Sequence, residues 1–308
     1  MTSRTWILGA PDPEMEMIER LLRQAGERVL HAVGREGRRV TAAAAYAPHA
    51  VSGDVGEDDH AILVECDLPA ERVVSVKRCD HHRPGDPGYG RPPAEYLAAS
   101  SIGQVLHLLL GGEGRDAAIA ADPELRLVAA ADHCLGAAYR GECPGVDPDQ
   151  LMRWRAASRA TFQRRTVEAV LADVEAAMAA LRAAPELLVI AYPPGESSGQ
   201  CGLCERPTHH DYAVESDCDG ICEGHIMAIL ADMRRPTPVP ELPEAATRLG
   251  VGYVSGPLKT PGQADKFTCS GTPAQVRAWM DIWAPPRLTG IYGDPERGFA
   301  GGYAEVMP

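Results

Sequence analysis

The sequence predicts an α/β protein with two domains, the first of them built on a mostly parallel sheet. Short β-branched apolar runs alternate with segments whose apolar residues recur at helical spacing, which is the pattern of strand and helix units. The chain has 308 residues, and at roughly 150 residues per domain both domains have room for a hydrophobic core. An Ala-rich stretch, residues 149–184, has no Gly or Pro and is the natural connector.

The individual elements follow from the spacing of apolar residues. Apolar side chains from Met15 to Ala25 recur every three or four positions, which is the period of a helix. Runs rich in β-branched residues favour strands. The predicted strands are residues 5–10, 61–64, 73–76, 187–192, 251–254 and 266–269, and the predicted helices are residues 15–25, 94–110, 123–131, 149–185, 241–249 and 273–283.

These elements divide the chain into a first domain, a connector and a second domain. The first domain covers residues 1–148. Residues 149–185 are predicted as one linker helix, about 50 Å long at a rise of about 1.5 Å per residue. The second, smaller α/β domain covers residues 186–308 and carries a cysteine-rich insert at about 196–226.

The charge and composition exclude several classes of function. Acidic side chains outnumber basic ones by 43 to 30, and the net charge of −13 argues against tight binding of a nucleic-acid duplex. Aromatic residues make up 5% of the chain, so no stacking platform for single strands is expected. The apolar runs fall far short of the about 20 residues of a membrane span, and the first residues lack the features of a signal peptide. We therefore expect a soluble, cytoplasmic protein with no membrane partner.

Acidic residues and histidines gather where a parallel sheet would present its carboxyl edge. Carboxylates that converge raise one another's pKa and need cations between them. Aspartate and imidazole together suit Mn²⁺, Fe²⁺ or Mg²⁺. Two such ions, about 3.5–4 Å apart, are typical of hydrolysis of a phosphate ester or anhydride, because they activate water and neutralise phosphoryl oxygens. The four clusters are Asp12 with Glu14, Asp67, Asp80-His81-His82, and Asp132-His133.

Each cluster also has an ordinary structural explanation. The first pair could be first-turn acids of a helix, which the helix dipole favours. Asp67 could be a loop residue exposed to solvent, and Asp132-His133 could cap a helix. The Asp80-His81-His82 segment has no comparable packing role, and four clusters in order favour a functional site.

In this order, the four clusters resemble the motifs of the DHH phosphoesterase family. This family includes single-strand exonucleases, oligoribonucleotide and cyclic-dinucleotide hydrolases, exopolyphosphatases and family II inorganic pyrophosphatases. The resemblance covers about residues 5–140, and residues 298–303 are more loosely similar to the family's glycine-rich substrate loop. It implies an N-terminal domain that holds two Mn²⁺ ions, or Mg²⁺, Fe²⁺ or Co²⁺, and a C-terminal domain that closes on substrate.

The resemblance also implies roles for individual residues. Asp67 would bridge both ions, and Asp12 would bind one of them. His82 and Arg83 would face the phosphate, where cationic side chains stabilise charge that develops on oxygen. The other ion would be bound by Glu14, His81 and Asp132, and further substrate contacts would come from Gly301, Gly302 and Arg297.

Two features depart from the family pattern. Leu8 stands where the first motif usually has a histidine, so one ion loses a ligand. The glycine-rich segment also lacks its usual histidine and has Phe299 and Tyr303 nearby. The residues considered as replacements for the missing ligand are His133, His60 and His49.

Two cysteine pairs in the second domain have the spacing of a zinc site. Paired thiolates with glycines in tight turns are typical of a tetrahedral structural Zn²⁺. Because four thiolates complete the coordination, we expect this zinc to be structural rather than catalytic. Four unrelated thiols are the alternative. The cysteines are Cys201, Cys204, Cys218 and Cys222, and the histidines that could replace one of them are His209, His210 and His225.

The favoured hypothesis is a metal-dependent phosphoesterase that hydrolyses a phosphoester or phosphoanhydride bond of a small phosphorylated or nucleotide substrate, with metal-activated hydroxide as the nucleophile. The alternative is a degenerate relative that binds a nucleotide or a protein partner without hydrolysis, which Leu8 supports. A third hypothesis makes the cysteine pairs a nucleic-acid module on a nuclease, which the net charge disfavours. The sequence indicates neither the particular substrate nor the oligomeric state.

Overall fold

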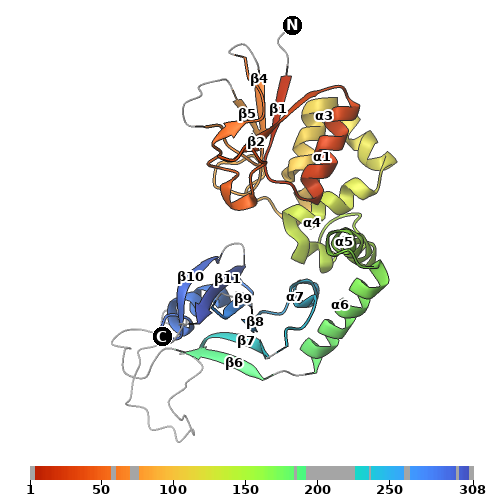
Figure 1. The fold of residues 1–308 in the computed structure, drawn as a ribbon. Helices are drawn as coiled ribbons and strands as arrows, with labels where there is room; N and C mark the ends of the chain where they lie inside the picture. Colours follow the sequence, from red (N-terminus) through yellow and green to blue (C-terminus); the bar gives the residue numbers. More distant parts are fainter. Residues whose placement is uncertain are drawn as a thin grey trace, which may run out of the picture. The chain divides into compact units, whose positions relative to one another are not determined.

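The computed structural model describes residues 4–56, 60–69, 76–183, 186–191, 226–235, 237–259, 264–295 and 298–304. The chain forms two compact units, residues 1–167 and residues 168–308, and each unit has its own sheet (Figure 1). Helices accompany both sheets, and the predicted α/β class is confirmed. The first unit contains every cluster of acidic residues and histidines that the sequence analysis singled out.

The first unit is built on a five-stranded sheet with the order β3-β2-β1-β4-β5. Strands β2, β1, β4 and β5 run parallel, and the short β3 pairs antiparallel with β2. Trp6, Ile7 and Leu8 of the central strand have no exposed surface, as expected for a parallel strand covered on both faces. The strands are β1 (Arg4–Leu8), β2 (Arg28–Val33), β3 (Ala50–Val51), β4 (His60–Val64) and β5 (Val76–Cys79).

Two strands of this sheet differ from the sequence-based prediction. β2 was not predicted, because Arg28 and His31 interrupt its apolar residues. The strand expected at 73–76 is seen as β5, which begins at Val76, and residues 73–75 lie outside the described residues. β1 and β4 lie where they were predicted, and the carboxyl ends of β1, β4 and β5 share one edge of the sheet.

Helices α1 and α3 pack against each other beside this sheet (Figure 1). The side chain of Asp12 caps α1 by accepting the Met15 N–H at 2.7 Å. The helix predicted at 94–110 is divided at Ser100, which has extended backbone and caps α3. The helices of this unit are α1 (Pro13–Gln24), α2 (Tyr96–Ala99), α3 (Ser101–Ala121), α4 (Glu124–Tyr139) and α5 (Pro148–Gln163), with short 3₁₀ turns at Ala42–Ala44 and Pro93–Glu95.

The stretch predicted as one linker helix forms two helices instead. α5 ends at Arg164, whose φ of 55° is left-handed, and α6 (Val167–Arg182) follows. The Arg164 N–H turns back to the carbonyls of Ala160 and Thr161, which is how a left-handed residue closes a helix. Within the part of the chain that the structure describes, no helix is both long and apolar enough to cross a membrane.

The second unit is built on a six-stranded sheet with the order β10-β11-β9-β8-β7-β6. Only β7 and β8 are parallel neighbours, and the other pairs are antiparallel. Its core includes Val254, Val276 and the fully buried Trp279. The strands are β6 (Leu187–Ala191), β7 (Ile226–Arg234), β8 (Tyr253–Leu258), β9 (Lys266–Ser270), β10 (Leu288–Asp294) and β11 (Phe299–Ala304), and the helices besides α6 are α7 (Leu242–Leu249) and α8 (Pro273–Ala278), which continues as a π-helical turn, Trp279–Trp283.

The glycine-rich segment expected to be a substrate loop is strand β11. It pairs on one side with β10 and on the other with β9. A Cβ on Gly301 would lie 2.5 Å from the hydroxyl of Tyr292, so this glycine lets a cross-strand tyrosine lie against the sheet. Gly302 lies against Leu288 in the same way. Arg297 lies outside the described residues.

We predict that Gly9→Ala destabilises the first unit by about 1–3 kcal/mol, the usual cost of forcing extra atoms into a packed interior. Gly9 follows β1 and donates its N–H to the Val64 carbonyl at 2.9 Å. A Cβ there would lie 2.3 Å from the Glu65 carbonyl oxygen. Urea unfolding measures the change, and Gly34→Ala is the control because its nearest atom, the Arg38 carbonyl oxygen, is 3.9 Å away. Equal unfolding midpoints for the two variants would contradict the prediction.

Candidate metal centre

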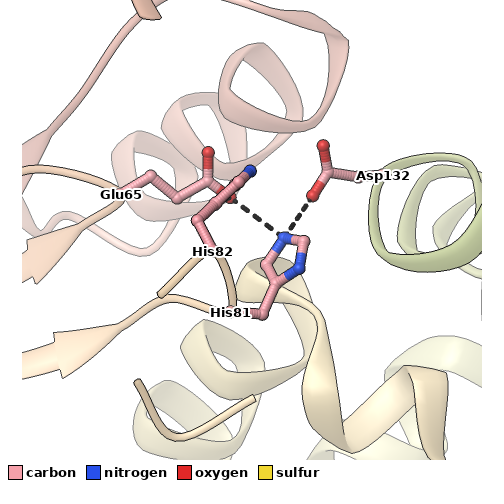
Figure 2. A group of neighbouring side chains, drawn as sticks. All are labelled: Glu65, His81, His82 and Asp132. Atoms are coloured by element: carbon pink, nitrogen blue, oxygen red, sulfur yellow. Dashed lines mark hydrogen bonds and ion pairs between the residues drawn. The ribbon is translucent and has the colours of Figure 1, made fainter. Parts of the chain in front are cut away.

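Four side chains at the carboxyl edge of the first sheet form a group that could hold a metal ion: Glu65, His81, His82 and Asp132. One ligand atom from each lies within 4.8 Å of the ligand atoms of the other three. Glu65 follows β4, the two histidines follow β5, and Asp132 comes from α4 (Figure 2). Three segments far apart in the sequence therefore supply two carboxylates and two imidazoles to one place.

Glu65 is the residue of this group that the sequence analysis missed. It directly follows the buried strand β4, and its side chain lies between β4 and the two histidines (Figure 2). Its φ of 51° is left-handed, and its N–H donates to the Cys79 carbonyl at 3.1 Å. Its Oε1 is buried, has no hydrogen-bond partner among the described residues, and lies 3.5 Å from His81 Nε2 and 4.0 Å from His82 Nδ1. A buried carboxylate oxygen without a hydrogen bond fits a cation.

His81 lies at the middle of the group. Its Nε2 is 2.6 Å from Asp132 Oδ2 and 3.5 Å from Glu65 Oε1 (Figure 2). Burial alone would lower its pKa, but the hydrogen bond to Asp132 and the nearby carboxylate of Glu65 outweigh burial and raise the pKa to about 10. Burial likewise opposes the charge on Asp132, and the bond to His81 holds the Asp132 pKa at about 2. In the absence of a metal, a proton on His81 supplies the positive charge that the carboxylates need.

Asp80 positions the two histidines and is itself fully enclosed, with no exposed surface. Its carboxylate accepts the His81 N–H at 2.7 Å, the His82 N–H at 3.1 Å and His82 Nδ1–H at 3.0 Å. The Tyr46 hydroxyl also donates to it, at 2.9 Å. Burial by itself raises the pKa of Asp80, but the bonds from His82 and Tyr46 outweigh burial and lower it. Asp80 is therefore an anchor for the loop, because its oxygens are already occupied.

Asp12 and Glu14 lie next to the group, in the first turn of α1. Asp12 caps the helix, Glu14 is one of its first-turn acids, as the structural alternative expected, and Glu14 Oε1 accepts the Ile102 N–H at 2.9 Å. Glu14 Oε2 is buried and has no hydrogen-bond partner within the described ranges. Burial, then Glu65 and Asp132, raise the pKa of Asp12 to about 7. Burial, then Asp132 and Glu65, raise the pKa of Glu14 well above its usual value, so both acids feel the charges of the group.

Asp67 is not one of the four residues, although the family resemblance made it the bridging ligand. Its Oδ1 accepts a hydrogen bond from Arg78, and its Oδ2 lies 3.3 Å from Arg83 Nη1. Glu65 lies nearer the end of β4 than Asp67 does, and it is the residue after this strand that belongs to the group of four. The Arg83 guanidinium also lies over the Tyr46 ring, 3.2 Å from its centroid. In the structure Arg83 is thus held by an acid and an aromatic ring.

Position 8, where the family resemblance expects a histidine ligand, is a leucine and offers no ligand atom. Leu8 is fully buried in β1. None of its three possible replacements belongs to the group of four. His60 begins β4, at the end opposite Glu65, and His49 is exposed. His133 Nδ1 lies 3.2 Å from His81 Nδ1, and its Nε2 lies 3.1 Å from the Arg91 carbonyl oxygen.

Several predicted site residues belong to other parts of the chain. Gly301 and Gly302 lie in the second unit, whereas the four residues of the candidate metal centre lie in the first. Cys134 is half-buried, interrupts α4 with non-helical backbone, and places its Sγ 3.2 Å from Cys143 Sγ. The zinc prediction lies outside the described residues, as do all its members, Cys201, Cys204, Cys218, Cys222, His209, His210 and His225.

The fold and the group together define an α/β protein with a buried candidate metal centre at the carboxyl edge of a parallel sheet. Comparison with known families, curated proteins and solved structures finds no match for this chain. The function of this chain is therefore inferred from the chemistry of its own side chains.

We predict that Asp12→Asn stabilises the metal-free protein at about pH 8, and that this gain shrinks toward about pH 4. The pKa of Asp12 rises from 3.8 to about 7 on folding, so the native state binds its proton more tightly than the unfolded state. Stability from this residue is therefore present at low pH and is lost as pH rises through that window. Asparagine keeps the oxygen that accepts the Met15 N–H.

Urea unfolding in the presence of a chelator measures this effect across the pH range. Asp147→Asn is the matched control, because Asp147 is a helix-capping aspartate at an exposed site, the start of α5. The stability of Asp147→Asn relative to wild type is measured over the same pH range. An Asp12→Asn profile parallel to that of the control would contradict the prediction.

Proposed function

We propose that this protein is a metal-dependent phosphoesterase that hydrolyses a small phosphorylated or nucleotide substrate, with Mn²⁺ or a similar divalent ion held by Glu65, His81, His82 and Asp132. The observation that carries the proposal is the convergence of these four ligand atoms within 4.8 Å of one another. The DHH family resemblance supports the same reaction class. When bound, the ion would supply an acidified water as nucleophile and positive charge for the phosphoryl oxygens.

The chemistry of the donor set supports a divalent ion. Two carboxylates and two imidazoles suit Mn²⁺, Fe²⁺ or Co²⁺ better than a metal that prefers thiolates. The free oxygen Glu65 Oε1 and the second free oxygen, Glu14 Oε2, are both buried and lack hydrogen bonds among the described residues. Asp12 and Glu14 add carboxylates beside the group, which is where a second ion would find ligands.

Arginines beside the centre support a phosphorylated substrate. Arg83 adjoins His82 in the chain and is partly exposed, and Arg78 contacts the same carboxylate, Asp67. A guanidinium binds phosphate through paired hydrogen bonds. Here Asp67 and the Tyr46 ring hold Arg83 in place, so it would meet the substrate already oriented. The net charge of −13 favours a small substrate over a polyanion.

The alternative function is binding of a nucleotide or a partner protein without hydrolysis. Its specific support is Leu8, which is buried and offers no ligand atom at the position where the family resemblance expects a histidine. If the protein binds a nucleotide in the presence of Mn²⁺ but releases no phosphate, this alternative holds and the phosphoesterase proposal fails.

Glu65→Gln and His81→Ala should each lower Mn²⁺ affinity by more than about 100-fold, because even residues that only orient a ligand change affinity by about 10–100-fold. Isothermal titration of the chelator-treated protein measures this affinity, and elemental analysis counts the zinc predicted for the cysteine-rich insert separately. His107→Ala, an exposed histidine of α3, is the matched control and should bind as wild type does. Unchanged affinity in both site variants would reject the centre.

Phosphate release should require the same residues. The assay offers nucleotides, cyclic dinucleotides, pyrophosphate and short oligonucleotides with added Mn²⁺, and we expect release from at least one of them by wild type and by His107→Ala. The rate of phosphate release by Glu65→Gln should be at least about 100-fold lower than that of wild type, because removing one group that stabilises a transition state lowers the rate by about that factor. Activity that survives in this variant would contradict the proposal.

Asp67→Asn distinguishes the proposed set of metal ligands from the set that the family resemblance implies. Because Asp67 pairs with Arg78 and Arg83 and is not one of the four grouped residues, this variant should keep Mn²⁺ affinity within a few-fold of wild type. Its KM for the substrate should change instead, because Arg83 loses its partner. Loss of Mn²⁺ binding in Asp67→Asn, with binding retained in Glu65→Gln, would restore Asp67 as the ligand.

A further inference from the structure

His133 contacts the proposed centre without belonging to it. Both of its ring nitrogens are engaged: Nε2 lies 3.1 Å from the Arg91 carbonyl oxygen, and Nδ1 lies 3.2 Å from His81 Nδ1. The two rings are tilted by 58°, with their centroids 5.0 Å apart, so the contact runs edge to edge between nitrogens rather than by stacking. Neither nitrogen is left to bind an ion.

The direction of each hydrogen bond follows from one fact: a carbonyl oxygen only accepts. His133 Nε2 must therefore carry the proton that it donates to Arg91. A neutral imidazole has a proton on one nitrogen only, so His133 Nδ1 is bare and accepts. The nitrogen that faces it, His81 Nδ1, must then carry a proton. With a neutral His133, the chain from the Arg91 carbonyl to His81 has only this arrangement.

This arrangement makes Nε2 the nitrogen of His81 that can give up its proton to bind the ion. Nε2 is the nitrogen that lies 2.6 Å from Asp132 and 3.5 Å from Glu65. Without His133, His81 could lose the proton on Nδ1 and keep the one on Nε2, where Asp132 accepts it, and that tautomer offers no lone pair to a metal. A hydrogen bond to the far nitrogen of a ligand histidine is a known means of fixing its tautomer.

We infer that His133 is a positioning residue that holds His81 as the Nδ1–H tautomer and so directs its Nε2 lone pair into the metal centre. The inference rests on the proposed function, because it assigns a role toward the ion proposed there. It makes Arg91, through its main-chain carbonyl alone, part of the same relay. His133 is therefore not a replacement for the ligand absent at Leu8, because it orients His81 instead of binding the ion.

The first test reads the protons directly in the metal-free protein. Two-bond ¹⁵N–¹H correlation spectra of the metal-free protein should show protons on both ring nitrogens of His81, and in His133 a proton on Nε2 with Nδ1 bare. A bare Nδ1 in His81, or a protonated Nδ1 in His133, would overturn the inference. This reading needs no metal, so it stands even if wild-type protein binds no divalent ion and the proposed function fails.

The second test compares two variants of one residue. His133→Leu, which has no acceptor, should lower Mn²⁺ affinity by about 10–100-fold, the usual cost of losing such a partner. His133→Asn, whose side-chain oxygen lies near the position of Nδ1, should restore affinity to within a few-fold of wild type. His107→Leu is the exposed control, and circular dichroism confirms that each variant is folded. Equal affinity for His133→Leu and wild type would refute the role of His133, as would equal losses in the Leu and Asn variants.

Discussion

The first unit depends on a concentration of buried negative charge that its own fold creates. Glu65 and Asp132 converge on His81, and Glu14 lies close to both of these acids. Glu14 and Glu65 each have one buried oxygen that accepts no hydrogen bond among the described residues. Enclosure of this kind is costly unless positive charge is present. In the metal-free state protons meet the need, which is why the pKa values of Asp12 and His81 are raised. A divalent ion would meet the same need with two charges at one point.

The general position of this centre could be predicted from the sequence because topology determines it. In a parallel sheet, the residues after each strand meet at one edge, whatever their distance in the chain. That rule alone brings His81 together with the acids of the first helix, and the order of strands β1, β4 and β5 satisfies it. Asp132 also joins the group, although it comes from a helix, because α4 packs against α1. The β-branched runs at residues 61–64 and 73–76 were sufficient to predict the strands whose carboxyl ends form this edge of the sheet.

The choice between Glu65 and Asp67 could not be predicted, because it depends on a backbone turn. The chain turns immediately after β4 with left-handed geometry at Glu65, and two residues later Asp67 meets Arg78. Nothing in residue type marks that turn, since glutamate rarely adopts it. The break at Arg164 escaped prediction for the same reason, because a left-handed arginine gives no sequence signal. The glycine-rich strand β11 was misread because its glycines make room for cross-strand side chains rather than for a loop.

The backbone at Glu65 also restricts what evolution or an engineer can place there. A left-handed residue is accommodated most easily as glycine, asparagine or aspartate, and poorly as a β-branched or bulky residue. Aspartate would suit the main chain better than glutamate, but its carboxylate is one methylene shorter and would draw back from the histidines. The left-handed backbone at position 65 favours a short side chain, whereas contact with the histidines requires a long one. The residue present, glutamate, satisfies the second requirement at the expense of the first.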